Sequence, residues 1–368
     1  MTSPRLLWDC GTAYDLFVSL EVLHRPAEFG VRGAWAAGVR ARLPATEREI
    51  LEQSQLLFLV PLHWIYALPG PKDAAAVLWT LRQIRPAERL PDLALAPDKA
   101  SAEIVETLRR VAARGAWDER DQEIIKALPA CDSEKSSHTP EELVQILDWW
   151  SRPEEFGERY LAALYAYQEA FFAEEESRIR PALQEALSRA QELADRLALS
   201  DLLEELSQGL RFGELTGVAE LVLAPSFWCT PLVYWGKVGA GRTAWLFGAR
   251  PPDSSLVPGE VVPDAILRVL KALSDPTRLR ILHYLTQAPL TPSQLARRLR
   301  LRAPTVTHHL NTLRLAGLVQ LTLGEGHEVK AYAARSGAIT ATFASLQGFM
   351  ESGRAKDPDP LSPQRRDR

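Results

Sequence analysis

The 368-residue sequence predicts a mainly α-helical protein with small β parts. Apolar residues recur at helical spacing through much of residues 1–215, for example in 13–24, 98–114 and 141–150. The pattern changes in 218–248, where short aromatic-rich apolar runs alternate with Pro and Gly, as they do in strands. We therefore expect a helical N-terminal body that carries a short antiparallel sheet.

Capping residues mark two helix starts in this body. Thr46 with Glu49, and Thr139 with Pro140 and Glu142, have the residue types and spacing of N-terminal caps. These pairs predict helices that begin directly after the two threonines.

A long helical pattern covers residues 154–198, and Pro181 predicts a kink or a break within it. The most apolar run, residues 56–70, contains Pro61 and His63 and is shorter than the roughly 20 residues of a membrane span. We interpret this run as buried core and expect no membrane contact.

The expected sheet has three strands, near 218–224, 231–238 and 243–248. Gly239–Gly241 would form the hairpin turn between the second and the third strand. Residues 251–263 then carry four prolines, which is typical of a linker.

The cysteines Cys10, Cys131 and Cys229 are too few and too scattered for a disulfide framework, and they suit a reducing cytoplasm. Asp9 and Asp15 lie among the first apolar residues, so no signal peptide is apparent. Histidines and cysteines show no close ligand spacing, and we expect neither a metal nor a cofactor.

Charge is distributed unevenly along the chain. Residues 264–335 hold eleven basic and four acidic residues, a net charge of +7. Residues 1–263 hold 27 basic and 39 acidic residues, a net charge of −12. A basic module next to an acidic body is the pattern expected of a DNA-binding domain joined to a domain that does not bind DNA.

The basic module combines four helices with two short strands. The first helix is expected at 264–273, and the second after Asp275, because Asp followed by Pro276 is a common helix start. Residues 291–294, Thr-Pro-Ser-Gln, form a capping box that begins the third helix. Apolar residues that we expect these two helices to bury are Leu279, Ile281, Leu282, Leu285, Leu295 and Leu299.

The fourth helix is expected at 304–316, and Gly317 ends it in the left-handed conformation. Strands at 318–323 and 328–334 would flank a glycine-rich turn, Gly-Glu-Gly-His, at 324–327. This order of elements is that of a winged helix-turn-helix, a fold that commonly inserts one helix into the DNA major groove.

In the fourth helix, Val306, Leu310 and Leu313 form one apolar stripe. Small or polar residues occupy the opposite face, and arginines flank it. His309 lies beside the stripe, so we interpret it as structural. The residues that we expect to contact bases or phosphates, two of them in the wing, are Arg298, Arg302, Pro304, Thr305, Thr307, His308, Asn311, Arg314, His327 and Lys330.

The module resembles the ArsR-type family of bacterial winged-helix regulators in residues 272–285, 305–319 and the strand that contains Lys330. The resemblance implies a homodimer formed through flanking helices and a palindromic operator. Arg302 and Thr307 depart from the family, where serine is common at these positions. The cysteine pair and the Asp/His pairs with which founding members sense metals are absent from the corresponding segments.

The strand region carries a cluster of aromatic residues that could line a pocket for a small molecule: Phe227, Trp228, Tyr234, Trp235 and Trp245. The favoured interpretation of the same residues is an ordinary core between sheet and helices. Catalytic motifs such as Gly-x-Ser-x-Gly, a P-loop or His-Glu-x-x-His are absent.

We therefore expect a sensor or assembly domain at 1–250, the linker at 251–263, a DNA-binding domain with flanking helices at 264–351 and a disordered tail at 352–368. The sequence favours a dimeric transcriptional regulator, a repressor responsive to a small molecule, rather than an enzyme. The alternatives are an enzyme with an appended regulatory module and a protein-interaction scaffold.

Overall fold

The computed structural model describes residues 4–97, 100–130, 137–211, 218–257, 262–323 and 329–355. The chain forms two compact units. The N-terminal unit comprises Met1–Leu202 and Leu215–Pro251, and the C-terminal unit comprises Leu203–Glu214 and Pro252–Arg368. The chain changes unit between Pro251 and Pro252, and residues 203–214 group with the C-terminal unit. The end of the linker (258–261) and the tail beyond 355 lie outside the described residues.

The N-terminal unit contains a mixed four-stranded sheet, in the order β1 (Arg5–Trp8), β3 (Glu220–Ser226), β5 (Arg242–Gly248), β4 (Tyr234–Gly239). The predicted β4–β5 hairpin is antiparallel, as expected. The pairings β1–β3 and β3–β5 are parallel. The sheet is therefore mixed rather than antiparallel, because β1, β3 and β5 run parallel to one another and β4 runs antiparallel to β5.

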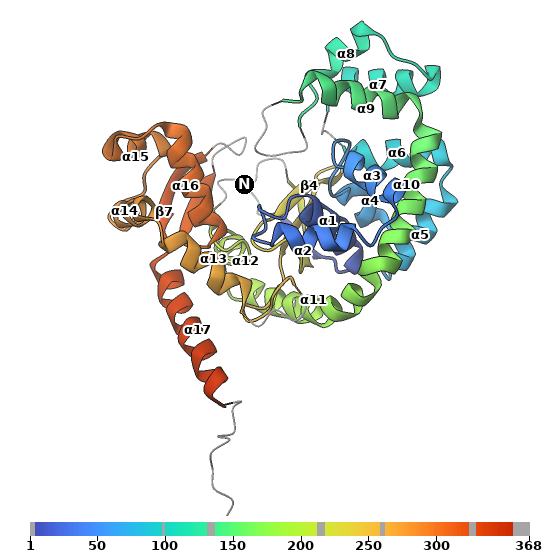
Figure 1. Cartoon of the computed structure of the whole chain (residues 1–368). Coiled ribbons are helices and arrows are strands. Elements are labelled where there is room, and N and C mark those ends of the chain that lie inside the picture. The colour runs from blue at the N-terminus through green and yellow to red at the C-terminus, as the bar shows by residue number, and fades with distance from the viewer. Residues whose placement is uncertain are drawn as a thin grey trace, which may run out of the picture. The chain divides into compact units, whose positions relative to one another are not determined.

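Helices make up most of this unit, as predicted (Figure 1). They are α1 (Thr12–His24), α2 (Gly33–Arg40), α3 (Ala45–Ser54), α4 (Leu62–Ala67), α5 (Ala74–Gln83), α6 (Pro86–Ala94), α7 (Ala102–Arg114), α8 (Glu119–Ile125), α9 (Pro140–Ser151), α10 (Pro153–Tyr167), the π-helical turn η1 (Gln168–Phe172) and α11 (Ala173–Ala194). In α12 (Leu199–Leu206), the chain passes from the N-terminal to the C-terminal unit.

Helix α1 forms the centre of the core, since all its residues from Thr12 to Leu23 are buried. The Asp15 carboxylate is completely buried there, and its Oδ1 accepts hydrogen bonds from the Ser226 hydroxyl (2.7 Å) and the Trp228 backbone N–H (2.8 Å). Burial raises the pKa of Asp15 to about 7, although these two hydrogen bonds oppose the shift.

The structure contains one of the two helix caps predicted for the N-terminal unit. Thr139 forms the predicted capping box with Glu142. Thr46 does not cap α3: the helix begins at Ala45, after Pro44, two residues earlier than predicted, and the Thr46 hydroxyl bonds Glu47 instead. Pro181 lies inside α11, and the long helical segment departs from α geometry at η1 rather than at this proline.

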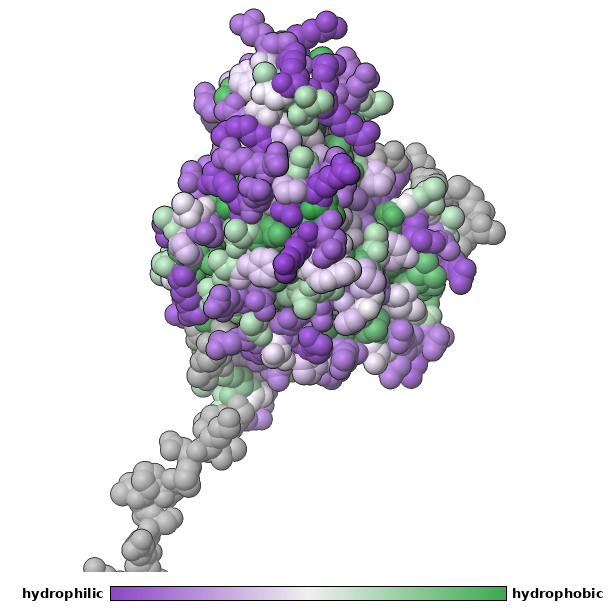
Figure 2. Space-filling view, turned by 90° about the vertical axis from the view of Figure 1, so that its right-hand side faces the viewer, coloured by the Kyte–Doolittle hydropathy of each residue, from purple (hydrophilic) through white to green (hydrophobic). Residues whose placement is uncertain are grey.

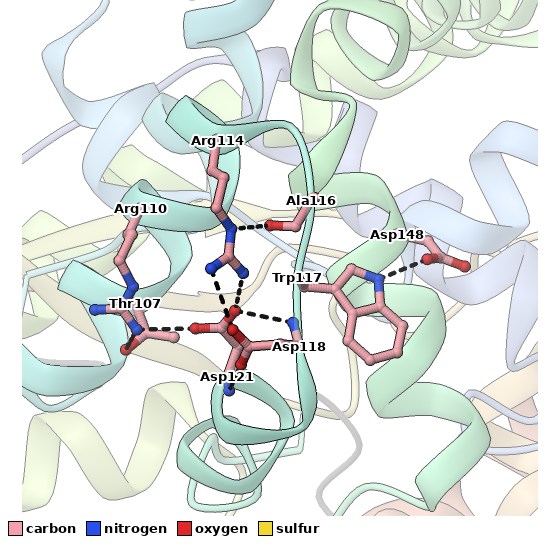
Figure 3. A network of polar contacts seen from close by, with 8 residues as sticks. All are labelled: Thr107, Arg110, Arg114, Ala116, Trp117, Asp118, Asp121 and Asp148. Atoms are coloured by element: carbon pink, nitrogen blue, oxygen red, sulfur yellow. Dashed lines mark hydrogen bonds and ion pairs between the residues drawn. The ribbon is translucent and has the colours of Figure 1, made fainter.

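Helices α7, α8 and α9 pack together and are joined by a polar network (Figure 3). Asp121 is buried at its centre and accepts hydrogen bonds from the side chains of Arg110 (2.9 Å) and Arg114. Asp118 shares a capping box with Asp121, which fixes the start of α8. The hydrogen bond from Trp117 Nε1 to Asp148 (2.8 Å) ties the connecting loop to α9.

The C-terminal unit has the predicted order of elements: α13 (Asp264–Leu273), α14 (Pro276–Leu285), α15 (Pro292–Leu299), α16 (Ala303–Leu315), β6 (Val319–Leu323), β7 (Val329–Ala334) and α17 (Ser336–Ala355). Its sheet is three-stranded, because the two-residue strand β2 (Leu210–Arg211) pairs with β6 in parallel. Leu290 adds an antiparallel bridge to Tyr332 of β7. In Figure 1, α17 leaves the group α13–α16 as a single extended helix.

Hydrophilic side chains cover most of the face shown in Figure 2, where hydrophobic side chains form small separate patches. In the part of the chain that the structure describes, the helices are too short or too polar to cross a lipid bilayer. The apolar run 56–70 contributes buried residues to the core, as predicted, among them Leu57, Phe58 and Ile65.

Candidate nucleic-acid interface

Capping hydrogen bonds fix the starts of the two helices that precede the reading helix α16. Asp275 Oδ1 accepts from the backbone N–H groups of Thr277 (2.7 Å) and Arg278 (2.9 Å). These hydrogen bonds lower the pKa of Asp275, which keeps the cap ionised. The capping box predicted for α15 is confirmed, with Thr291 and Gln294 bonded reciprocally.

The turn between α15 and α16 depends on Arg300. Its φ of 56° is left-handed, a conformation that is strained for a residue with a Cβ. This geometry lets the backbone N–H of Leu301 reach the carbonyl of Ala296 at 3.0 Å and ends α15. The Arg300 side chain is exposed at this turn.

The reading helix is oriented by the predicted apolar stripe. Val306, Leu310 and Leu313 are fully buried. Gly317 follows the helix with φ of 70°, as predicted for its end. Leu279 of α14 does not join this core: it is 48% exposed, because its position on α14 lies opposite the buried Ile281.

Burial of the stripe leaves the opposite face of α16 in solvent. The side chains predicted to approach DNA at the start of this helix are all exposed: Arg302, Pro304, Thr305, Thr307 and His308. They are small or polar; Arg302 directly precedes the helix, and its N-terminal half carries the other four. In proteins with this fold, that half of the reading helix contacts base edges.

Two of the three threonine hydroxyls on this helix are oriented by the backbone. Thr307 Oγ1 donates to the carbonyl of Ala303, and Thr312 Oγ1 to that of His308, each at 3.1 Å. Since each hydroxyl proton is used within the helix, the oxygen of Thr307 faces solvent as an acceptor. It is therefore suited to amino groups of adenine or cytosine, and its methyl group to the methyl group of thymine.

Three further residues of α16 are less accessible to solvent than the exposed residues at its start. Asn311 and Arg314 are half-buried, and burial lowers the pKa of Arg314, which lies near Tyr332. His309 is also half-buried, and burial lowers its pKa, as suits the structural role predicted for it. The tilted His308 ring lies 6.1 Å from that of His309 and is exposed.

Positive charge surrounds the exposed face. Arg297, Arg298, Arg300 and Arg302 are all exposed, and residues 292–315 contain no Asp or Glu. The guanidinium of Arg298 lies over the ring of Tyr284, 5.7 Å from its centroid, which restricts this side chain. No carboxylate within residues 292–315 offsets these arginines, so the surface of α15 and α16 can attract a polyanion.

The wing contacts predicted from sequence cannot be placed in the same way. His327 lies outside the described residues, with the rest of the turn at 324–328. Lys330 belongs to β7, but its side chain also lies outside the described part of the chain.

The structure disperses the aromatic residues predicted to line a ligand pocket. Phe227, Trp228 and Trp245 are buried in the core. Tyr234 is half-buried, and its hydroxyl donates to Glu21 of α1 at 2.8 Å. Trp235 is different: it lies on β4, the edge strand of the sheet, and is 41% exposed.

The two-residue strand β2 of the C-terminal unit could not be identified from the sequence. Arg335, at the end of β7, donates to the carbonyls of Gly317 (3.0 Å) and Gln208 (2.8 Å). The neighbouring Gly209 has φ of 116° and accepts a hydrogen bond from the Leu321 backbone N–H at 2.8 Å. A two-residue strand has no periodicity of its own, and the glycine was the sole available signal.

Among the residues that the structure describes, no group of three His, Cys, Asp or Glu side chains is arranged to hold a metal ion. Cys10 and Cys229 are free thiols, and burial is the main cause that raises the pKa of each.

Comparisons with known proteins match only the C-terminal part of the chain. A family model described as a helix-turn-helix domain matches residues 273–322. The HTH-type transcriptional regulator CmtR of Mycobacterium tuberculosis is 44% identical over 71 residues, which are 19% of this chain and 59% of that protein. The CmtR protein of Mycobacterium bovis matches equally.

The transcriptional repressor SdpR of Bacillus subtilis is 39% identical over 51 residues, 14% of this chain and 57% of that protein. The chain thus covers less than two thirds of the length of these curated relatives. No solved structure matches the chain. The helix-turn-helix of the C-terminal unit is therefore of the kind found in these regulators, and these matches do not extend to the N-terminal unit.

Proposed function

We propose that this chain, whose C-terminal unit carries an ArsR-type helix-turn-helix, is a dimeric, sequence-specific DNA-binding transcriptional regulator. The observation that carries the proposal is the division of α16 into two faces. Val306, Leu310 and Leu313 hold one face in the core, while the opposite face presents polar side chains among exposed arginines. The regulator acts in the cytoplasm, in keeping with its free thiols.

In the proposed complex, the N-terminal half of α16 enters the major groove. Thr305, Thr307 and His308 contact base edges, and the exposed Arg298 and Arg302 contact phosphates. Arg314 has a smaller part than its charge suggests, because it is half-buried near Tyr332.

The proposed dimer forms through α17. Every described side chain of this 20-residue helix is exposed or half-buried, including Phe343 (53% exposed) and Met350 (63% exposed). A helix that exposes large apolar side chains to solvent is stabilised when a second helix covers them. Two copies would then present their reading helices to half-sites about 34–36 Å apart.

We further propose that the protein represses transcription and that a small molecule bound by the N-terminal unit changes its affinity for DNA. Support comes from the size of the N-terminal unit and from the word repressor in the name of the relative SdpR. A ligand produces such a change only by binding the DNA-competent and the incompetent state with different affinity.

Binding-site selection from random duplex DNA, with the full-length protein near physiological salt, tests this function. Recovery of an inverted repeat would support a dimeric, sequence-specific regulator. Retention of all sequences alike, or of none, would contradict the proposal.

A further inference from the structure

A groove in the N-terminal unit lies against the edge strand of its sheet. Its volume is about 370 Å³, within the range of small-molecule sites. It is lined by residues from β4, from the start of α4 with the segment before it, and from the end of α6 with the segment after it, among them His63, Pro97, Trp235 and Lys237.

The walls of the groove are mainly apolar, and they include the partly exposed indole ring of Trp235. Trp235 pairs in register with Trp245, so that both rings lie on the same side of the sheet. Trp245 is 2% exposed, whereas Trp235, on the edge strand, is 41% exposed. Its ring can therefore stack on a flat ligand without any rearrangement of the core.

Lys237 contributes a positive charge to the described lining of the groove. Lys237 is two residues after Trp235 on the same strand, so its side chain lies on the same side of the sheet and is exposed. None of the described lining residues is acidic. His63 Nε2 donates to the carbonyl of Asp92 (2.8 Å), because a carbonyl can only accept, and this bond holds the imidazole at the groove wall.

We propose that this groove binds a small aromatic molecule that carries an anionic group, such as a carboxylate or a sulfonate. The ring stacks on Trp235 between the apolar walls, and the anion lies near the Lys237 ammonium. The groove would be the effector site of the proposed regulator. This effector role rests on the proposed function, whereas the binding of the ligand does not.

Two fluorescent probes that share one ring system separate the aromatic from the anionic contribution. The probes are anilinonaphthalene sulfonate and the uncharged N-phenyl naphthylamine, titrated into the full-length protein without DNA. The expected result is saturable binding of both probes at one site per chain, with tighter binding of the sulfonate.

Substitutions assign the binding to this groove. Trp235→Ala should weaken both probes by about tenfold or more, because the stacking surface is lost. Lys237→Gln should weaken the sulfonate by about two- to fivefold and leave the uncharged probe unchanged. Matched controls are Trp79→Ala, which removes a 60% exposed tryptophan of α5, and Lys126→Gln, which removes an exposed lysine outside the groove.

Equal binding by the native protein and the Trp235→Ala variant would overturn the proposal, as would binding that does not saturate. An equal effect of Lys237→Gln on both probes would overturn the anionic part. Fluorescence anisotropy with labelled DNA on the same samples tests the regulator function separately. A protein that binds the probes but no DNA would contradict the proposed function and leave the groove assignment intact.

Discussion

Leu210 pairs in parallel register with Leu321, so that the segment after α12 supplies the third strand of the winged-helix sheet. The strand covers the outer edge of β6, which would otherwise expose unpaired backbone groups. Arg335 holds the same segment through the carbonyl of Gln208. Residues 203–214, which separate the two stretches of the N-terminal unit in the sequence, are therefore part of the C-terminal unit.

Gly209→Ala should weaken this strand pairing. Gly209 has φ of 116°, and a Cβ there would lie 2.8 Å from Cδ of Arg335 and 3.1 Å from the carbonyl oxygen of Val319. We expect a cost of about 1–3 kcal/mol in the pairing of β2 with β6. Hydrogen exchange of the peptide that contains Leu321, whose N–H donates to Gly209, should become about tenfold faster or more.

Gly348→Ala is the matched control for this change, because a Cβ at this position of α17 meets no atom within 4 Å. It should leave exchange in β6 unchanged. Identical exchange in the two variants would mean that β2 contributes nothing to the sheet.

Substitutions at the reading helix should separate base contacts from phosphate contacts. Thr307→Ala or His308→Ala should relax sequence preference and lower the affinity for the selected site by about 1–3 kcal/mol per lost contact. Arg298→Ala should weaken selected and random DNA alike and reduce the salt dependence of binding. Anisotropy titrations at several salt concentrations measure both effects, and equal losses on both DNAs for all three variants would contradict base reading.

Arg300→Gly should stabilise the C-terminal unit while it weakens DNA binding. The left-handed φ of 56° costs an arginine about 1 kcal/mol that glycine does not lose, but the substitution also removes an exposed positive charge. Far-ultraviolet circular dichroism during urea unfolding gives the stability, and DNA titration gives the affinity.

Arg297→Ala provides the comparison, because it removes an exposed charge from α15 and relieves no backbone strain. It should weaken DNA binding without stabilising the unit. A destabilised Arg300→Gly variant would show that the arginine side chain makes a stabilising contact in the turn.

Asp15 should make the N-terminal unit less stable as pH rises. Burial raises its pKa to about 7 from 3.8, so between these values the unfolded chain loses a proton that the folded chain keeps. The free energy of unfolding should fall across this range, by on the order of 1 to 4 kcal/mol, and become level above pH 7. Tryptophan fluorescence in urea reports this unit selectively, since all ten tryptophans lie in residues 1–263.

Asp15→Asn should flatten this pH dependence, because the amide cannot ionise. Glu174→Gln, which changes an exposed carboxylate of α11, should leave it intact. The assignment to Asp15 fails if both variants keep the native slope.

Asp121→Asn should destabilise the α7–α9 region by about 1–2 kcal/mol, because the two arginines lose a shared carboxylate. Burial opposes ionisation of Asp121, but hydrogen bonds, first that from Arg110, outweigh it and lower the pKa below 3.8. The stabilisation is therefore complete above pH 3.8 and is lost as pH falls through the lowered pKa. Hydrogen exchange in α8 measures the effect, and Glu119→Gln in the first turn of the same helix is the control.

The reading helix could be predicted from residue order because its evidence is local. The spacing of Val306, Leu310 and Leu313 determines which face is buried, and therefore that Thr307 and His308 face solvent. The caps at Thr139 and Thr291 were equally predictable, since each needs only residues three positions apart.

What the sequence by itself determined is the helical body, the β4–β5 hairpin and the winged helix-turn-helix, each encoded in contiguous residues. Only the tertiary structure decided the parallel pairing of β1, the addition of β2 to the winged-helix sheet and the separation of Trp235 from the buried Trp245. These features depend on segments far apart in the chain that meet through backbone pairing and burial. Local periodicity carries no information on such long-range contacts. The pairing partner of a four-residue or two-residue strand is therefore decided only when the chain folds.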